Sequence, residues 1–248
     1  MRLFRVSFTP VVAVMLALGA ATSGYATLTA GVRAEPTPPV TLTAPMTAPA
    51  SPVTPQDPPA ATQDPMDQAL AQTLTQDFRE QFAAVIAYAR QTARAQGRTR
   101  NAVVVLDLDE TLMDMRAYYL TYKRYDPALF NAWALRADAP AIAETLAFVR
   151  WLNARGIPVY FVTGRREHLR AVTVKNLARY GGLRYAGLFM KPEAYADPSA
   201  VAFKSGVRRR LEAAGKRVIL SLGDQASDLR GGHAGVGIKL PNPLYSIP

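Results

Sequence analysis

The stretch "VVVLDLDETL", from Val103 to Leu112, places four aliphatic residues directly before two aspartates that a single leucine separates. A continuous apolar run rich in β-branched residues predicts a strand over Ala102–Leu106 that is buried on both faces. Asp107 and Asp109 follow the end of that strand, and side chains two residues apart in an extended chain point to the same side. Because two neighbouring carboxylates resist joint ionisation without a cation, the stretch indicates either a metal site or a polar turn that caps the next helix.

Strands and helices alternate along the rest of the sequence. A long amphipathic helix is predicted over Asp67–Gln96, because apolar residues recur there at three- and four-residue steps and Gly97 follows. Further strands are predicted in "IPVYFVT", "YAGLFM" and "RVILSLG", with helical stretches between them. This alternation predicts the α/β class, with a three-layer, Rossmann-like and mainly parallel sheet joined by right-handed crossovers.

Acidic residues also follow a second predicted strand. In "LGDQASDL", Asp224 and Asp228 come after the apolar run Val218–Leu222. If this strand lies beside the first, both acids converge with Asp107 beyond the carboxyl ends of the strands, where sheets of this kind bind ligands. Burying such charges costs on the order of several kcal/mol per ion unless something neutralises them. Mg²⁺ is the expected ion because it prefers carboxylate, carbonyl and water oxygens, and Ca²⁺ stays open as an alternative.

Residues suited to a phosphate follow a third predicted strand. The segment "FVTGR" offers the hydroxyl of Thr163, a close backbone approach at Gly164 and the cation of Arg165. Taken alone, the same three residues are more typical of an ordinary strand-to-helix turn. Lys191 and Lys204 are two candidates for a cation that offsets the phosphate and the acids.

These motifs, in this order, resemble the haloacid dehalogenase superfamily. More narrowly, "DLDETL", "VTGR", "FKSGVRRRLEAAGKRVILSLGDQASDL" and the tail "KLPNPLYSIP" resemble its acid phosphatase branch, which includes class B and class C acid phosphatases and plant vegetative storage proteins. The resemblance covers roughly residues 67–248 and implies one phosphatase domain with a small helical cap at about 111–138. The aromatic residues of the cap, Phe130 and Trp133 among them, either stack on an aromatic leaving group such as a nucleoside or pack the cap against the main domain.

The resemblance also implies a role for each matched acid. Asp107 would be the nucleophile that forms an aspartyl phosphate, and Asp109 the general acid that protonates the leaving oxygen. Mg²⁺ would be held by the Asp107 carboxylate, the Asp109 backbone carbonyl and Asp224. Asp228 would lie in the shell of residues that supports these metal ligands.

The phosphate-binding residues follow from the same match. Thr163 and Gly164 would contact the phosphate. Lys204 is expected to be the active-site lysine, because "FKSGVRRRLEAAG" opens the helix before the last acidic motif, and Lys191 is the fallback. One departure from the family is Ala226, where many relatives carry Trp; it alters a wall of the site and leaves the chemistry untouched.

The implied activity is the Mg²⁺-dependent hydrolysis of phosphomonoesters. Two alternatives stay open: a non-catalytic phosphate-binding or storage-type member of the same fold, and a narrow-specificity 5′-nucleotidase. The expected partners are small phosphomonoesters, with nucleotides among them, and no nucleic acid. His168 and His233 are expected at the surface or behind the site, because no Arg-His-Gly or Gly-x-Ser-x-Gly segment accompanies them.

The first 66 residues predict export followed by a linker. Arg2 and Arg5 precede an apolar run over Val11–Ala21 and then small residues, which is the layout of a signal peptide. The uncharged stretch from Val11 to Val32 is almost long enough for a membrane anchor. Residues 35–66 are rich in Pro, Thr and Ala, a composition typical of a disordered linker. The expected location is therefore periplasmic, envelope-tethered or secreted.

The charge balance assigns the excess of cations to the folded part. Three arginines in residues 1–34 cancel three acids in residues 35–66, so the formal net charge of +10 belongs to the remainder. A basic domain suits anionic partners, but the cations are scattered along the sequence except for "RRR" at 208–210, and scattered cations predict a solvated surface. The absence of cysteine excludes disulfides, thiolate nucleophiles and zinc–cysteine sites.

Overall fold

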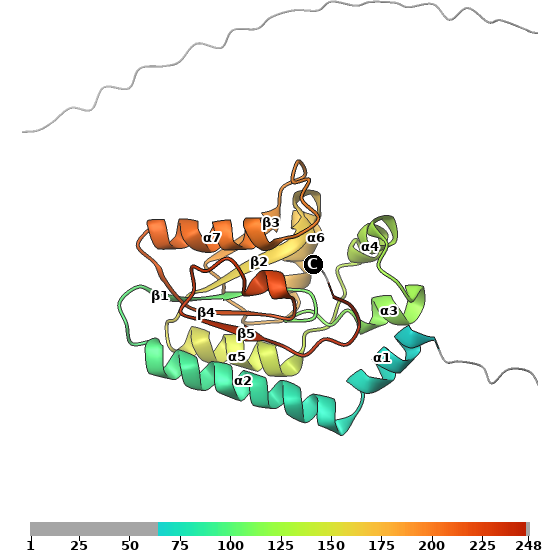
Figure 1. The fold of residues 1–248 in the computed structure, drawn as a ribbon, viewed down its shortest axis with the longest axis horizontal. Coiled ribbons are helices and arrows are strands. Elements are labelled where there is room, and N and C mark those ends of the chain that lie inside the picture. Colours follow the sequence, from blue (N-terminus) through green and yellow to red (C-terminus); the bar gives the residue numbers. More distant parts are fainter. Residues whose placement is uncertain (1–63, 247–248) are drawn as a thin grey trace, which may run out of the picture. The chain divides into compact units, whose positions relative to one another are not determined.

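The computed structural model describes residues 64–246, and the predictions for residues 1–34 and for the linker up to residue 63 lie outside these described residues. The described part is built on one sheet of parallel strands in the order β3-β2-β1-β4-β5 (Figure 1). The strands are β1 (Ala102–Leu106), β2 (Val159–Arg166), β3 (Gly187–Lys191), β4 (Arg217–Gly223) and β5 (Val236–Lys239). Within this part no helix has the length and apolar character that crossing a membrane requires.

Helices cover both faces of the sheet, which confirms the predicted α/β class. In Figure 1, α2 (Gln76–Gln96) and α5 (Ala143–Ala154) lie along one face and α7 (Val201–Ala213) along the other. All residues of β1 are buried, because alternate side chains face the two helical layers: Val103 and Val105 pack in one apolar cluster with α7, and Val104 and Leu106 pack in the other with α2 and α5.

The predicted long helix over 67–96 is wrong, because the structure divides it. The first helix, α1 (Pro65–Thr73), begins two residues before the predicted start of the helix at Asp67, and α2 follows after a break at Leu74 and Thr75. Thr75 causes the break: its hydroxyl accepts a hydrogen bond from Phe78 N at 3.2 Å and so caps a new helix. Leu74, which the apolar period places on the buried face, is instead 60% exposed.

The predicted cap region contains two short helices, α3 (Arg116–Tyr122) and α4 (Pro127–Ala134). Asp126 begins α4 by accepting hydrogen bonds from the first two free amides, at 2.9 and 3.0 Å. The cap holds together through the buried ring of Tyr118, whose centroid lies 5.0 to 5.9 Å from four other aromatic rings, those of Tyr119, Tyr122, Phe130 and Trp133. Most of the cap aromatics therefore pack against one another, while Tyr125 is 58% exposed.

The remaining elements complete the crossovers. They are the helix α6 (Arg170–Ala178) and two short 3₁₀ turns, η1 (Glu167–Leu169) and η2 (Ala226–Asp228). The edge strand β5 was not predicted, because its four residues include a glycine and show no apolar run.

The order of the strands locates the site. The chain adds β2 and β3 on one side of β1 and then β4 and β5 on the other, so the order reverses between β1 and β4. A crevice for ligands forms beyond the carboxyl ends of the strands at such a reversal. Asp107 and Asp224 directly follow these two strands.

Candidate active site

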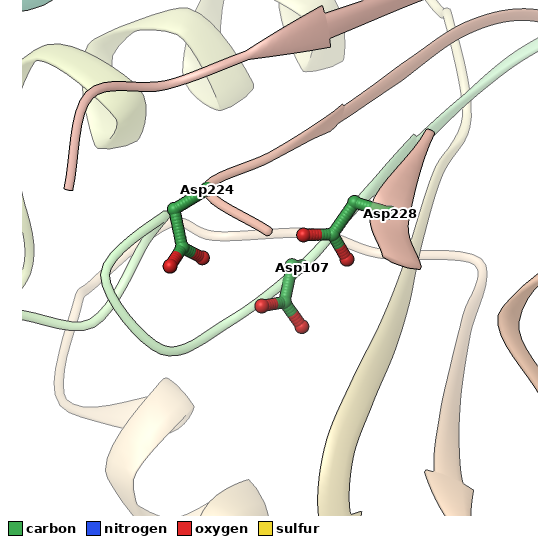
Figure 2. Close-up of side chains that lie close together, drawn as sticks. All are labelled: Asp107, Asp224 and Asp228. Carbon is green, nitrogen blue, oxygen red and sulfur yellow. The ribbon is translucent and has the colours of Figure 1, made fainter. Parts of the chain in front are cut away.

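Three buried carboxylates converge beyond β1 and β4. The register pairs Leu106 with Leu222, and Asp107 N donates a hydrogen bond to Leu222 O at 3.0 Å, which fixes the two strand ends side by side. Figure 2 shows the carboxylates of Asp107, Asp224 and Asp228 turned toward one space. One ligand atom from each lies within 4.8 Å of the others. The predicted convergence of the three acids is therefore what the structure shows.

The turn after β4 places Asp228 against the backbone. Asp228 Oδ2 accepts a hydrogen bond from Gln225 N at 2.9 Å, so the carboxylate folds back over the strand end. A Cβ at position 223 would lie 2.2 Å from Asp228 Cγ, which leaves glycine as the residue that fits there. Gly223 is thus required by a close approach and not by an unusual backbone angle.

Lys204, from α7, lies among the acids. Its Nζ is 2.5 Å from Asp228 Oδ1 and 3.1 Å from Asp107 Oδ1. Burial alone would lower the pKa of Lys204, but the attraction of Asp107 and Asp228 is stronger and raises the pKa above its usual value. Lys191, the alternative lysine, has its Nζ over the ring of Tyr195 instead. Of the two candidates, the structure brings Lys204 to the acids.

The site carries more negative than positive charge. Three carboxylates and one ammonium give a formal charge of −2, and all four groups are buried. Burial raises the pKa of Asp107, with Asp228, Asp224 and Asp109 adding to the effect and Lys204 opposing it. Burial and Asp228 raise the pKa of Asp224 to about 6. A bound divalent cation would bring this formal charge from −2 to zero. It would also favour the ionised form of each carboxylate that ligates it.

The hydrogen bonds show which oxygens are left for a cation. Both oxygens of Asp228 have partners, Lys204 on Oδ1 and Gln225 N on Oδ2. Asp224 Oδ2 accepts from the side-chain amides of Gln225 and Asn242 at 2.5 and 2.7 Å, which leaves Oδ1 with a long contact of 3.3 Å to the Thr111 hydroxyl. Asp107 Oδ1 is buried, and within the described residues its one polar contact is with Lys204 Nζ at 3.1 Å. The donor set thus fits a hard divalent ion held by Asp107 and Asp224, with Asp228 behind them.

Asp109 is held apart from this cluster by Arg165. The guanidinium donates from Nε at 3.0 Å and from Nη2 at 2.7 Å to the Asp109 carboxylate. It also donates to the Thr173 hydroxyl at 3.3 Å and lies 5.4 Å from the centre of the Phe130 ring in the cap. The sequence reading offered Arg165 to the phosphate, whereas in the structure its guanidinium is bound to Asp109.

The two predicted phosphate-binding residues lie at the end of β2, beside β1. Thr163 is fully buried, and its hydroxyl accepts a hydrogen bond from Arg165 N at 3.2 Å. Gly164 is exposed, and no atom lies within 4 Å of the position that a Cβ would take. The backbone at Gly164 is therefore open to the close approach of a ligand.

Three further residues support the site and were not predicted to do so. Asn242 comes from the C-terminal tail, and Thr111 from the turn that follows β1. Arg208, the first residue of the "RRR" run, is fully buried and donates to the carbonyls of Asp228 at 2.8 Å, Gly232 at 2.9 Å and Arg230. The sequence set the "RRR" run apart from the scattered cations without predicting a role for Arg208, and α7 turns this side chain under the loop that carries Asp228. All three residues lie in segments that carry the family resemblance, but a motif shows no contact between side chains.

Comparison with known proteins places the chain in a family. The family model "HAD superfamily, subfamily IIIB (Acid phosphatase)" matches residues 41–248. A stem 31 kDa glycoprotein of Glycine max is 33% identical over 153 residues, which are 59% of this chain and 60% of that protein. Acid phosphatase 1 of Solanum lycopersicum is 33% identical over 150 residues, 58% of this chain and 59% of that protein. The chain thus spans about 60% of the length of these curated relatives.

A solved structure shares the fold. The class C acid phosphatase from Bacillus anthracis superposes with a TM-score of 0.61 at 22% identity, over 74% of this chain and 86% of that one. Another relative, vegetative storage protein 1 of Arabidopsis thaliana, is 33% identical over 151 residues, 59% of this chain and 56% of that protein. The resemblance drawn from the motifs is confirmed. The chain belongs to the HAD superfamily, subfamily IIIB, the acid phosphatase family.

Proposed function

We propose that this protein is a Mg²⁺-dependent phosphomonoesterase that acts through an aspartyl-phosphate intermediate. The observation that carries the proposal is the buried Asp107 carboxylate, which lies at the end of a parallel strand, 3.1 Å from Lys204 and among two further acids. A nucleophilic carboxylate needs positive charge around the phosphorus that it attacks, and a lysine together with a cation site supplies it. The membership in the acid phosphatase family supports the same reading.

The first step is attack by one Asp107 oxygen on phosphorus. The P–O bond to the leaving alcohol breaks as the new Asp107–phosphorus bond forms. Lys204 neutralises charge on the phosphoryl oxygens from the side of α7, and the Thr163 hydroxyl donates to one of them from the end of β2. Because both side chains are buried and held by strands or a helix, their positions are set before the substrate arrives.

Asp109 is proposed to move the protons. It protonates the leaving oxygen in the first step and accepts a proton from the attacking water in the second, when inorganic phosphate is released. Arg165 is a positioning residue for this role, because two nitrogens of its guanidinium, Nε and Nη2, donate to the Asp109 carboxylate. The substrate class is small phosphomonoesters, and the exposed Tyr125 of the cap offers an aromatic surface to leaving groups that include nucleosides.

Mg²⁺, held by Asp107, Asp224 and the Asp109 carbonyl, would act as a Lewis acid on the phosphate oxygens. The supporting residues serve that arrangement: Asn242, Gln225 and Thr111 contact Asp224, and Lys204 neutralises Asp228. Export of the protein, inferred from residues 1–34, is part of the proposal, since phosphomonoesters outside the cytosol would then be its substrates.

The test is hydrolysis of p-nitrophenyl phosphate by the full chain across acid to neutral pH, with Mg²⁺ and with a chelator. We expect turnover that requires the metal. Asp107→Asn should abolish turnover while the circular dichroism spectrum is kept, because the amide is not nucleophilic. Asp77→Asn, the same change at an exposed site on α2, is the control and should leave the rate unchanged.

Turnover by Asp107→Asn equal to the parent would overturn the nucleophile assignment. A folded, metal-loaded protein that is silent on this substrate and on nucleoside monophosphates, yet still binds tungstate or vanadate, would instead identify a non-catalytic, storage-type member of the family.

A further inference from the structure

Cations that are scattered in the sequence gather along one edge of the folded domain. All strands are parallel, so the segments that enter them meet at the edge opposite the candidate active site. The segments that enter the four neighbouring strands β3, β2, β1 and β4, the last taken with the first residue of β4, are 179–186, 155–158, 97–101 and 214–217. They contain no acid and seven cations, which we call the basic edge: Arg98, Arg100, Arg155, Arg179, Arg184, Lys216 and Arg217.

The charges of the basic edge are not neutralised by ion pairs. Lys216 is half-buried and the six arginines are exposed. None of the seven takes part in an ion pair within residues 64–246. Glu212, on the last turn of α7, contacts His233 instead. The basic edge therefore presents its full positive charge to solvent.

The opposite edge of the sheet is mainly acidic. The segments that follow the strands, each counted with the last strand residue, are 106–115, 166–169, 191–200 and 223–235, and they contain nine acids and three cations, Arg166, Lys191 and Arg230. The domain is thus polarised, with an excess of acids around the candidate active site and only cations at the far edge. In Figure 1 the segments that enter β1 and β4 lie at the left, and the cap helices lie at the right.

Hydrogen bonds join the segments of the basic edge into one surface. Asn101 Nδ2 donates to Gly215 O at 2.9 Å, and Arg217 N donates to Asn101 O at 2.9 Å, which ties the segments before β1 and β4 together. Asn153, near the end of α5, exchanges two 2.9 Å hydrogen bonds with the backbone of Arg184. Since adjacent strands are about 4.8 Å apart, the cations form a continuous band across the edge.

A shallow pocket of about 280 Å³ opens within the band. It is lined by Arg184 together with apolar or weakly polar groups, among them Ile157, Pro158 and Tyr185. Cations around an apolar floor suit the headgroup region of a lipid bilayer, where phosphates lie above the start of the hydrocarbon.

We propose that the basic edge docks on anionic lipid headgroups and turns the acidic active site toward the aqueous phase. Charge complementarity supports this partner, since an anionic leaflet attracts a basic band and repels the acidic edge. The sequence ahead of the described residues adds a second reason, because residues 1–34 predict a signal peptide or anchor that brings the chain to a membrane. Nucleic acid is the competing polyanion and is an outcome of the test.

The size of the effect follows from the number of charges. Each basic side chain at an anionic lipid surface contributes about fivefold in affinity. Replacing three of them is expected to weaken docking by about a hundredfold. High salt should weaken it as well, because these groups are exposed to screening.

The experiment measures which edge of the folded domain faces the membrane, and not only whether the chain is bound. It can therefore be done with the full chain, whether or not residues 1–34 also insert into the bilayer. The protein has no cysteine, so Ala154→Cys at the basic edge and Ala132→Cys on the cap each give one labelling site on an exposed helical position. Energy transfer is measured from a donor dye at each site to acceptor headgroups in vesicles of phosphatidylcholine, alone or mixed equally with phosphatidylglycerol. We expect stronger transfer from position 154 than from 132 on the mixed vesicles only, and loss of the difference in high salt.

Matched triple variants test the residues. Arg98→Glu, Arg100→Glu and Arg217→Glu together should remove the difference between the two dyes. The control variant changes the net charge by the same amount at exposed positions away from the basic edge, with Arg124→Glu, Arg230→Glu and Lys239→Glu. It should keep the difference in energy transfer between the two dyes. Equal transfer from both dyes on anionic vesicles, or a difference that survives the first triple variant, would overturn the proposal. Binding to a DNA duplex without binding to the mixed vesicles would do the same and would favour nucleic acid as the partner.

Discussion

A methyl group at position 223 would lie 2.2 Å from the carboxyl carbon of Asp228, closer than any real contact. Gly223→Ala must therefore push Asp228 away from Lys204. We expect the free energy of unfolding to fall by about 1 to 3 kcal/mol, as for other overpacked sites, and the phosphatase activity to be lost with it. Denaturant unfolding measures the first effect and p-nitrophenyl phosphate hydrolysis the second.

Gly164→Ala is the matched control, because no atom lies within 4 Å of the added Cβ. Its unfolding free energy should stay within about 0.5 kcal/mol of the parent. If both alanine variants were equally stable, the close approach of Asp228 to Gly223 would not be present in solution.

Asp224 makes a second prediction at the scale of a single residue. In the metal-free chain its pKa is raised to about 6, chiefly by burial and by Asp228. At neutral pH the folded state must keep this carboxylate ionised at a cost, so Asp224→Asn should stabilise the metal-free protein by about 2 to 3 kcal/mol. The amide oxygen can still accept from Asn242 and Gln225. Chemical unfolding in chelator at pH 7 measures the change.

The same variant should lose its metal response. Added Mg²⁺ is expected to stabilise the parent and to leave Asp224→Asn almost unchanged, because a ligand is missing. If Asp224→Asn were less stable than the parent in chelator, the ionised Asp224 carboxylate would not destabilise the metal-free protein.

At the scale of elements, the segment after β5 reaches back to the acids. Leu240 N donates to Gly223 O at 2.9 Å, and Asn242 donates to Asp224 Oδ2 at 2.7 Å while its own Oδ1 caps Leu244 N. Groups that orient a ligand in this way commonly account for tenfold to a hundredfold in metal affinity. Asn242→Ala is therefore expected to weaken Mg²⁺ binding by about tenfold or more, measured by calorimetric titration of the full chain.

Asn153→Ala is the control for the same substitution at the far edge of the sheet, where Asn153 bonds to Arg184. It should leave the affinity for Mg²⁺ unchanged. Equal affinities in both variants would mean that the tail does not orient Asp224.

The elements also show where a sequence pattern misleads. The apolar period over 67–96 is continuous, but period alone cannot detect a break at which a threonine hydroxyl begins a new helix. The strands β1, β2 and β4 were found because buried parallel strands read as apolar runs. The edge strand β3 was found from the apolar residues of "YAGLFM", although only Met190 is buried there. The edge strand β5 was missed, because its four residues include a glycine and show no apolar run.

For the whole molecule, the unbalanced charge of the site predicts how stability depends on pH and metal. The pKa values of Asp107 and Asp224 are raised in the folded state, so the folded chain binds more protons than the unfolded chain over a window that for Asp224 runs from about pH 4 to pH 6. The metal-free protein should therefore lose stability as the pH rises through this window. At pH values above this window, Mg²⁺ at a hundred times its dissociation constant should raise the free energy of unfolding by about 2.7 kcal/mol.

Thermal unfolding in chelator and in Mg²⁺, at about pH 5 and pH 7, measures this dependence. The increase in melting temperature on adding Mg²⁺ should be larger at pH 7, because the cation no longer competes with bound protons. An increase that does not depend on pH would indicate that the two carboxylates are ionised throughout.

The sequence by itself determined the α/β alternation, the family and the acids at two strand ends, because apolar runs and the residues next to them are local features of the chain. It could not determine that Arg165 holds Asp109, that Asn242 holds Asp224, or that Arg208 lies buried under the loop of Asp228. Each of these contacts joins residues from different strands or helices, and it exists only once the parallel sheet has brought their ends together. The basic edge has the same origin, since cations from four separate segments become neighbours only through the order of the strands.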